Sequence, residues 1–298
     1  MAAEIISGTE MARTIREEIR VGVDEFKRTA GRPPGLATVL VGANPASQSY
    51  VRMKKRAALD LGMYSRQIEL DREIPEDELL GWIEGLNADP DIHGILVQLP
   101  LPPQIRKNRV LEAIHPAKDV DGFHPINVGR MVVGDPAALS PCTPLGVVEM
   151  LVRSGIQTRG RHAVVVGRSD IVGKPMGSML LGSGPGGDAT VTVTHILTRD
   201  LAAHTRMADI LVVAAGHPDL ITADMVKPGV VVIDVGVNRV ADPSREKGYR
   251  LTGDVAFEEV REVASVITPV PGGVGPMTIA MLLSNTLKAA RSLTRAVV

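Results

Sequence analysis

The feature that most constrains the fold of this chain is its alternation of short apolar runs with longer amphipathic segments. "GLATVLVG" (35–42) and "GILVQLP" (94–100) are apolar runs bounded by glycine or proline, which is typical of buried strands. "YSRQIEL" (64–70) is a third strand candidate, and helical patterns occupy residues 45–61 and 75–87 between the three. This β-α-β-α-β order favours a parallel sheet with helices on both faces.

Helical patterns also open and close the chain. Ser7 and Glu10 have the spacing of a capping box, so we expect a helix from there to about Thr29. We expect the last helix, at about 277–293, to return to the first domain. Residues 101–141 are rich in proline and glycine and have no clear period, which is typical of a connector or a site loop.

The segment after about Thr143 repeats the alternation of strands and helices. Its strand candidates are "RHAVVVG" (161–167), "ATVTVTH" (189–195), "DILVVAAG" (209–216), "GVVVIDVG" (229–236) and "SVITPV" (265–270). We therefore predict an α/β fold of two doubly wound domains. One domain comprises residues 1–142 and 277–298, and the other comprises residues 143–276.

Charge and cysteine content exclude several classes of function. With 33 basic and 34 acidic residues among 298, the chain has no basic field for a nucleic acid. No apolar stretch approaches the roughly 20 residues that span a bilayer, and no secretory signal is recognisable. The single cysteine, Cys142, excludes an internal disulfide. We expect a cytoplasmic protein with no nucleic-acid or membrane partner.

"VVVGRSDIVGKP" (164–175) has the strand-turn-helix context of a dinucleotide site, where helix-terminal N–H groups attract phosphate. Gly167 and Gly173 are six residues apart, so the usual G-x-G-x-x-G spacing is absent. A P-loop is rejected, because Pro175 stands where serine or threonine should follow the lysine. A plain turn without a ligand fits the same residues.

The end of the next strand bears on the choice of nucleotide. NAD-binding domains usually carry an acid there to hold the ribose hydroxyls, whereas this strand ends in His195 and Ile196. Arg168, in the glycine turn, can instead face a 2′-phosphate. The sequence therefore favours NADP over NAD.

Eight strings, in order over nearly the whole chain, coincide with one family. They are "YVRMKKRAALDLG", "GILVQLPLP", "KDVDGFHPINVGR", "PCTP", "GRSDIVGKPM", "DILVVAAGHP", "VVIDVGVNR" and "ITPVPGGVGPMT". On these strings the sequence resembles the bifunctional methylenetetrahydrofolate dehydrogenase/methenyltetrahydrofolate cyclohydrolases. The resemblance implies oxidation of 5,10-methylenetetrahydrofolate by hydride transfer to NADP, followed by hydrolysis of the methenyl product to 10-formyltetrahydrofolate. It also implies a homodimer that acts on tetrahydrofolate derivatives in one-carbon metabolism and purine biosynthesis.

The resemblance implies four catalytic side chains. Tyr50 matches the tyrosine that stacks on the folate rings, and Lys54, one helical turn later, matches the catalytic lysine. Gln98 matches the glutamine that orients this lysine, and Asp121 matches the aspartate that binds the amino-pyrimidine edge. Whether Lys54 activates water, moves a proton or stabilises charge stays open. The other basic residues nearby are expected to face solvent: Arg52, Lys55 and Arg56.

Further binding residues follow from the same resemblance. The folate-binding set adds Val97, Leu99, Pro271, Gly272 and Gly273 to Tyr50, Gln98 and Asp121. The nucleotide-binding set is Gly167, Arg168, Ser169, Ile196 and Val237. Some family members carry a serine where this chain has Ile196, so NADP selectivity depends more on Arg168 and Ser169. No complete ligand set surrounds Asp121 and its neighbour Asp119, and we predict no metal.

Three alternatives compete with this interpretation. The first is an NADP-dependent dehydrogenase without cyclohydrolase activity, against which the presence of Lys54 and Gln98 argues. The second is another two-domain NADP oxidoreductase, acting on amino or hydroxy acids, but no His–Asp pair with a clear local context supports it. The third is a non-enzymatic, nucleotide-responsive binding module, which would not need the set of folate-site residues.

Overall fold

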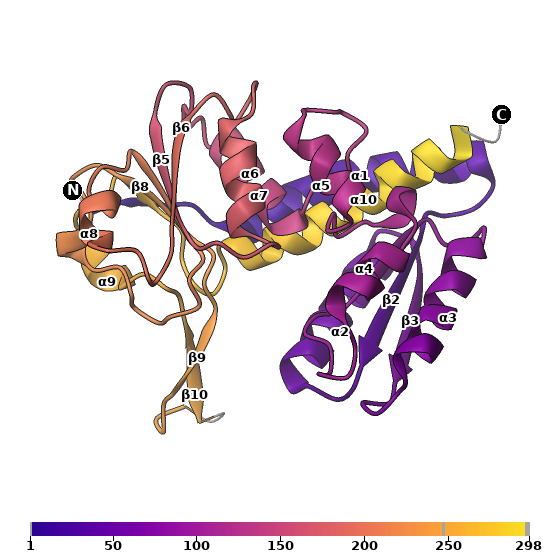
Figure 1. Cartoon of the computed structure of the whole chain (residues 1–298). Helices are drawn as coiled ribbons and strands as arrows, with labels where there is room; N and C mark the ends of the chain where they lie inside the picture. The colour runs from indigo at the N-terminus through magenta and orange to yellow at the C-terminus, as the bar shows by residue number, and fades with distance from the viewer. Residues whose placement is uncertain (1, 246–247, 296–298) are drawn as a thin grey trace. The chain divides into compact units, whose positions relative to one another are not determined.

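The computed structural model describes residues 2–245 and 248–295, which form two compact units (Figure 1). Unit 1 contains the described residues within 1–12, 132–134 and 143–278, and unit 2 contains those within 13–131, 135–142 and 279–298. The sequence-based boundaries placed residues 1–12 in the other domain. They group with unit 1 because β1 (Glu4–Ile5) pairs in parallel with β11 (Val266–Ile267).

Unit 2 is built on a three-stranded parallel sheet in the order β3-β2-β4. Its strands are β2 (Gly35–Val41), β3 (Tyr64–Leu70) and β4 (Gly94–Val97), and they are connected by α2 (Pro45–Asp60) and α3 (Glu76–Ala88). The central strand β2 is buried at every residue, because it pairs on both sides and both of its faces are covered. These five elements lie within three residues of their predicted positions.

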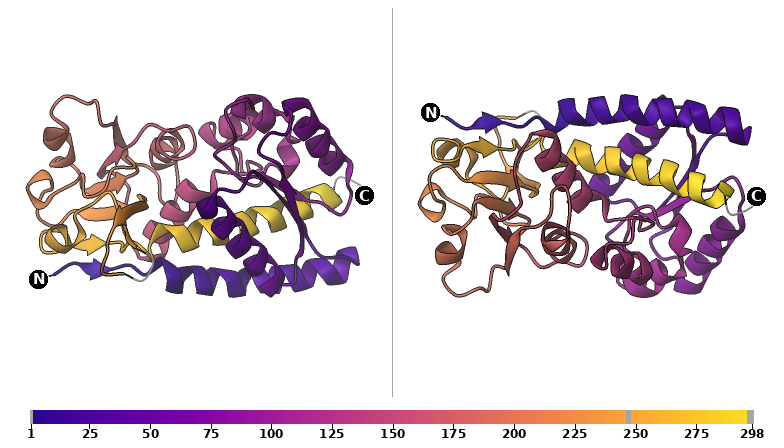
Figure 2. Two further views of the ribbon diagram at one scale, coloured as in Figure 1. Left: turned by 90° about the horizontal axis from the view of Figure 1, so that it is seen from below. Right: turned by 90° about the horizontal axis from the view of Figure 1, so that it is seen from above.

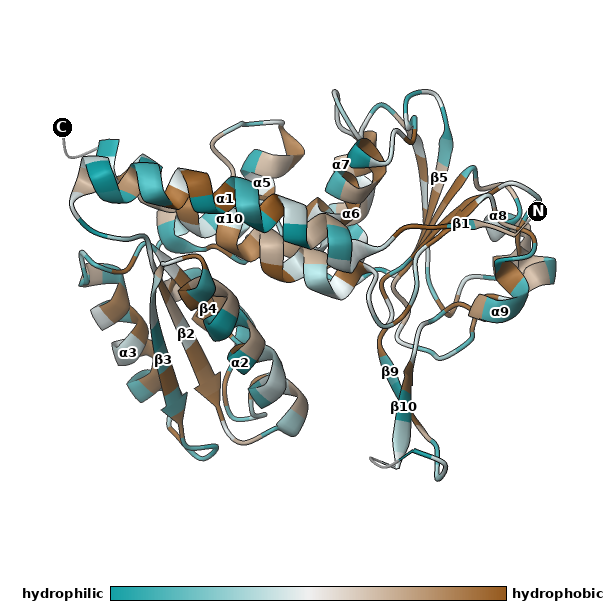
Figure 3. Ribbon diagram, turned by 180° about the vertical axis from the view of Figure 1, so that it is seen from behind, coloured by the Kyte–Doolittle hydropathy of each residue, from teal (hydrophilic) through white to brown (hydrophobic). Residues whose placement is uncertain are grey.

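Helices cover the two faces of this sheet. On one face, α3 and α4 (Lys107–Ala113) contribute to an apolar cluster that includes Val39, Ile83, Ile95 and Val110. The helix α2 packs against β2 and β3 with its own buried stripe, which includes Val51. Figure 3 shows apolar residues along β2 and β4, whereas β3 is partly polar.

The two long helices α1 (Gly8–Ala30) and α10 (Val274–Arg295) run side by side over residues 13–30 and 279–295 (Figure 2). Arg291 Nη2 lies 2.7 Å from Glu25 Oε2, and a Cβ added at Gly22 would lie 2.7 Å from Leu287 Cδ2. The prediction that the last helix returns to the first domain is confirmed. Among the described residues, no helix combines the length and the apolar character needed to cross a membrane.

The segment 101–141 is more regular than the sequence indicated. It contains α4, the short 3-10 helix η1 (Pro116–Lys118) and α5 (Pro125–Val132). The expectation of an irregular connector was wrong for these parts. Each helix is too short to show a period, and α4 is held by the packing of Val110 and Ile114 into the apolar cluster of unit 2.

Unit 1 contains a six-stranded parallel sheet in the order β1-β11-β8-β7-β5-β6. The remaining elements of unit 1 are α6 (Cys142–Arg153), β5 (His162–Val166), α7 (Gly173–Leu181), β6 (Thr190–Thr194), α8 (Leu201–Thr205), β7 (Ile210–Val213), η2 (Ala223–Met225), β8 (Val231–Asp234), β9 (Asn238–Ala241), β10 (Tyr249–Thr252) and α9 (Phe257–Val260). The chain passes from β5 to β6 and then returns to β7 on the other side of β5, so this sheet is doubly wound as predicted. The antiparallel hairpin β9-β10 was not predicted.

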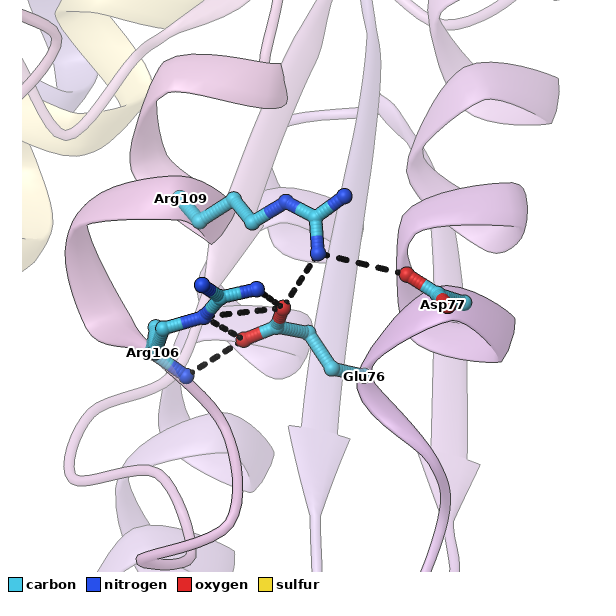
Figure 4. Close-up of polar contacts among 4 residues, drawn as sticks. All are labelled: Glu76, Asp77, Arg106 and Arg109. Carbon is cyan, nitrogen blue, oxygen red and sulfur yellow. Dashed lines mark hydrogen bonds and ion pairs between the residues drawn. The ribbon is translucent and has the colours of Figure 1, made fainter.

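An ion-pair cluster fastens α4 to α3 (Figure 4). Glu76 Oε1 lies 2.6 Å from Arg106 Nη2 and from Arg109 Nη1, and Asp77 also contacts Arg109. Glu76 Oε2 accepts the backbone N–H of Arg106, the residue that precedes α4, at 2.7 Å. Hydrogen bonds from the Arg106 side chain and backbone lower the pKa of Glu76 to about 2. The cluster therefore fixes the far end of the loop that follows Gln98.

We expect Glu76→Gln to lower the melting temperature at pH 7. The pKa of Glu76 is depressed in the folded state, so its contribution is complete above about pH 5 and is lost as the pH falls to about 2. The difference from wild type should therefore shrink on acidification, and also at high salt, because the arginines are largely exposed. Glu78→Gln, in the same helical turn, is the matched control. Equal melting temperatures for wild type and Glu76→Gln at pH 7 would contradict this interpretation.

Candidate active site

Lys54 and Gln98 meet in unit 2 at the carboxyl edge of the three-stranded sheet. Gln98 directly follows β4, and its backbone N–H continues the ladder to Val39 of β2 at 2.8 Å. Lys54 Nζ donates to Gln98 Oε1 at 3.0 Å, and Gln98 Nε2 donates to the Leu99 carbonyl at 2.8 Å. Because the amide is fixed at both ends, its carbonyl oxygen faces the lysine.

Lys54 is distinguished from its basic neighbours by burial. Its residue exposure is 5 %, whereas Arg52, Lys55 and Arg56 are exposed, as the helical pattern predicted. The ring centroid of Tyr50, one turn earlier on α2, lies 5.9 Å from Lys54 Nζ. Burial raises the pKa of the half-buried Tyr50 phenol, so the ring stays neutral at physiological pH. A flat aromatic surface therefore adjoins a buried cation.

The third component of the site is Asp121. Asp119 forms a parallel bridge with Ile95 of β4, which carries the chain toward the same edge of the sheet and places Asp121 there. Asp119 itself braces the loop, because its carboxylate accepts the N–H of His124 at 2.8 Å and Asn127 Nδ2 at 2.9 Å. Loss of hydration raises the pKa of Asp121, and the Lys54 ammonium opposes this rise.

The backbone next to Asp121 is held by two buried groups that were not predicted to belong to the site. Asn285 Nδ2, on α10, donates to the carbonyls of Val120 and Ser140, both at 2.9 Å. Cys142 Sγ donates to the Val120 carbonyl at 3.2 Å. A buried asparagine within an otherwise apolar helix face was the available signal for Asn285.

The other predicted folate-binding residues fall into two groups. Val97 is buried in the apolar cluster beneath the sheet, so only its backbone faces the site, and Leu99 is half-buried beside Gln98. Pro271, Gly272 and Gly273 lie in unit 1, where the Gly272 carbonyl accepts the Thr9 N–H at 3.0 Å. The structure does not group these three with Lys54, and their contact with folate stays a prediction.

A tight glycine turn follows β5 in unit 1. Gly167 has a φ of +145°, and a Cβ there would lie 2.3 Å from the Ala214 carbonyl oxygen. A Cβ at Gly173 would lie 2.1 Å from the Gly167 carbonyl oxygen. Ser169 Oγ accepts the N–H groups of Val172 and Gly173, at 3.2 and 3.3 Å. Only glycine fits at positions 167 and 173. Because no side chain covers the backbone there, a phosphate can approach it closely.

The remaining predicted nucleotide-binding residues are exposed around this turn. Arg168 is exposed within it, while Ile196 and Val237 are each about half exposed, in the loops after β6 and β8. The turn and the arginine together fit a phosphorylated nucleotide. Within the described residues, no group of three or more His, Cys, Asp or Glu side chains is arranged to hold a metal ion. The absence of a metal stays a prediction.

Comparison with known proteins identifies the family. Residues 6–121 match the tetrahydrofolate dehydrogenase/cyclohydrolase catalytic domain, and residues 141–294 match the NAD(P)-binding domain of the same family. The chain belongs to the tetrahydrofolate dehydrogenase/cyclohydrolase family. It is 59 % identical over 289 residues to the bifunctional protein FolD 1 of Myxococcus xanthus, covering 97 % of this chain and 98 % of that protein. The predicted family is thus confirmed.

Solved structures of this family share the fold. The bifunctional FolD enzyme of Campylobacter jejuni superposes with a TM-score of 0.92 at 49 % identity, covering 98 % of this chain and 100 % of that one. The Trypanosoma brucei FolD, solved with NADP cofactor and an inhibitor, has a TM-score of 0.94 at 43 % identity and covers 99 % of both chains. The predicted two-domain α/β fold is confirmed.

Proposed function

We propose that this protein oxidises 5,10-methylenetetrahydrofolate with NADP and hydrolyses the methenyl product to 10-formyltetrahydrofolate. The observation that carries this proposal is the hydrogen bond between the buried Lys54 and Gln98, beside Tyr50 and Asp121. A dehydrogenase without cyclohydrolase activity is not favoured, because it would not need this buried pair. Full-length relatives that are named bifunctional proteins support the same choice.

Unit 2 is the proposed folate-binding part. The neutral ring of Tyr50 offers a flat surface for the pterin, and the carboxylate of Asp121 can accept the paired N–H donors of its amino-pyrimidine edge. The hydrogen bonds of Asn285 and Cys142 hold the backbone beside Asp121, so this acceptor is positioned before the substrate binds. The backbone of residues 97–99 would form the neighbouring wall.

Lys54 is the proposed proton carrier of the hydrolysis. Gln98 holds it with a neutral carbonyl oxygen, and the Asp121 carboxylate is its electrostatic neighbour. Water adds to the methenyl carbon and loses one proton to the neutral form of the lysine amine. The bond from that carbon to N5 then breaks as N5 receives this proton, the hydroxyl group becomes the formyl carbonyl, and the hydroxyl proton is the one released overall. Gln98 keeps the amine oriented through both transfers.

We expect Lys54→Met to slow the hydrolysis of methenyltetrahydrofolate by about 10²- to 10⁴-fold, the usual contribution of a positioned acid or base. Loss of methenyl absorbance measures the rate, against buffer, because the compound also hydrolyses spontaneously. Lys55→Met, which removes the exposed lysine next in sequence, is the control and should match wild type. If wild type hydrolyses no faster than buffer while still reducing NADP, the protein is a dehydrogenase only.

Unit 1 is the proposed nucleotide-binding part, with the glycine turn against the phosphates and Val237 beside the cofactor. When bound, NADP supplies the acceptor for the hydride that leaves the methylene carbon. Ser169 closes the turn with its hydroxyl oxygen, and Arg168 provides a guanidinium for a 2′-phosphate. Ile196 has no polar group to share this role, so Arg168 should dominate the preference for NADP over NAD.

We expect Arg168→Ala to raise the KM for NADP about tenfold, because a charge-assisted contact to the 2′-phosphate is lost. The KM for NAD, which lacks that phosphate, should stay unchanged. Arg159→Ala, an exposed arginine before β5 at the opposite edge of the sheet, is the control. Equal increases for NADP and NAD would assign Arg168 to general phosphate attraction rather than to selectivity.

Three finer assignments complete the proposal. Among the described residues the edge strand β6 pairs only with β5, and this open edge with its exposed Val193 supports a homodimer. Cys142 is buried and free, which is consistent with a cytoplasmic location. The formyl product is of the kind consumed in purine biosynthesis, where one-carbon units are transferred to nitrogen.

A further inference from the structure

A buried carboxylate joins two loops at the carboxyl edge of the six-stranded sheet. Asp254 is fully buried, and its Oδ2 accepts the backbone N–H groups of Ala215 at 2.6 Å and Gly216 at 2.8 Å. Its Oδ1 accepts Asn238 Nδ2 at 2.8 Å. One side chain thus ties the loop after β7 to the loop after β8.

A second buried carboxylate supports the first. Asp234, the last residue of β8, accepts the N–H groups of Gly236 at 2.9 Å and Asp254 at 3.1 Å through Oδ1, and that of Val255 at 3.0 Å through Oδ2. Burial raises the pKa of Asp234 to about 7, and the nearby Asp254 adds to this rise. Burying two carboxylates so close together is costly, and their hydrogen bonds to the loop backbone offset that cost.

The backbone of the loops packs directly against the two carboxylates. A Cβ at Gly236 would lie 2.2 Å from the Asp254 carboxyl carbon, and a Cβ at Gly253 would lie 1.8 Å from Asp234 Oδ2. The two glycines therefore allow the backbone to close directly on the carboxylates.

These loops border the position where a doubly wound sheet binds its ligand. The strand order reverses between β5 and β7, and ligands bind outside the carboxyl ends of the strands at such a switch point. The glycine turn after β5 touches the loop after β7, because the Gly167 backbone packs against the Ala214 carbonyl. Neither Asp234 nor Asp254 is exposed, so both act through the backbone that they hold.

We propose that Asp254, supported by Asp234, is a positioning residue that fixes the loops 214–216 and 235–238 for binding of a nicotinamide nucleotide. The inference rests on the proposed function of unit 1. An ionised carboxylate suits this role because it only accepts hydrogen bonds, and all three groups directed at Asp254 are donors. An amide in its place would turn one N–H group toward another.

The test compares Asp254→Asn with Asp209→Asn. Asp209 is the matched control, because it also accepts a backbone N–H and a side-chain donor, from His162 and Lys227, but at the amino edge of the same sheet. NADPH binding is measured by the change in NADPH fluorescence, without turnover. We expect Asp254→Asn to raise the Kd for NADPH about tenfold. Its hydrolysis of methenyltetrahydrofolate, which needs no nucleotide, should stay within about twofold of wild type, and Asp209→Asn should keep the wild-type Kd.

A second variant covers the case in which Asp254→Asn does not fold. Asn238→Ala removes one donor at a half-buried position, and we expect a smaller increase in the same Kd. The inference is overturned if NADPH binding is unchanged in the variant that folds, or if Asp209→Asn weakens it equally. It is also overturned if hydrolysis falls in parallel with binding, since that indicates general destabilisation. Wild-type protein that binds no NADPH would instead refute the proposed function of unit 1, and this inference with it.

Discussion

Parallel pairing of strands determines where chemistry can occur in both units. Strands that run in the same direction end at the same edge, so side chains that follow neighbouring strands come together there. In unit 2, the hydrogen bond from the Gln98 N–H to the Val39 carbonyl fixes the position of Gln98 along the strand direction. It therefore determines where Gln98 meets Lys54, which lies on the helix that follows β2. In unit 1, the same alignment brings the turn at Gly167 against the backbone of Ala214.

The second common feature is that buried polar groups hold the loops at these edges. Asn285 and Cys142 secure the carbonyl next to Asp121, and Asp254 secures the amides of Ala215 and Gly216. Buried polar groups are costly unless their hydrogen bonds are satisfied, and satisfied networks favour a single conformation. The helix α10, which supplies Asn285, therefore contributes to the proposed folate site as well as to the core of unit 2.

Local patterns in the sequence predicted much of this architecture. The apolar runs that became β2 and β4 are bounded by glycine or proline, and the burial of Lys54 among exposed neighbours follows from helical spacing. The strand β1 was not predicted, because its two exposed residues show no pattern of hydropathy and its position is set by pairing with β11. The hydrogen bonds around Asp254 were not predicted for a different reason. The partners of Asp254 lie 16 to 39 residues away in the sequence, and only the fold brings them together.

The central claim is that Lys54 and Gln98 act as one unit in hydrolysis. The most direct measurement is the rate of methenyltetrahydrofolate hydrolysis by Lys54→Ala, Gln98→Ala and the double variant. If the glutamine acts only by orienting the lysine, as proposed, the double variant should be no slower than Lys54→Ala alone. Rate losses that multiply in the double variant would contradict the claim, because the two side chains would then act independently.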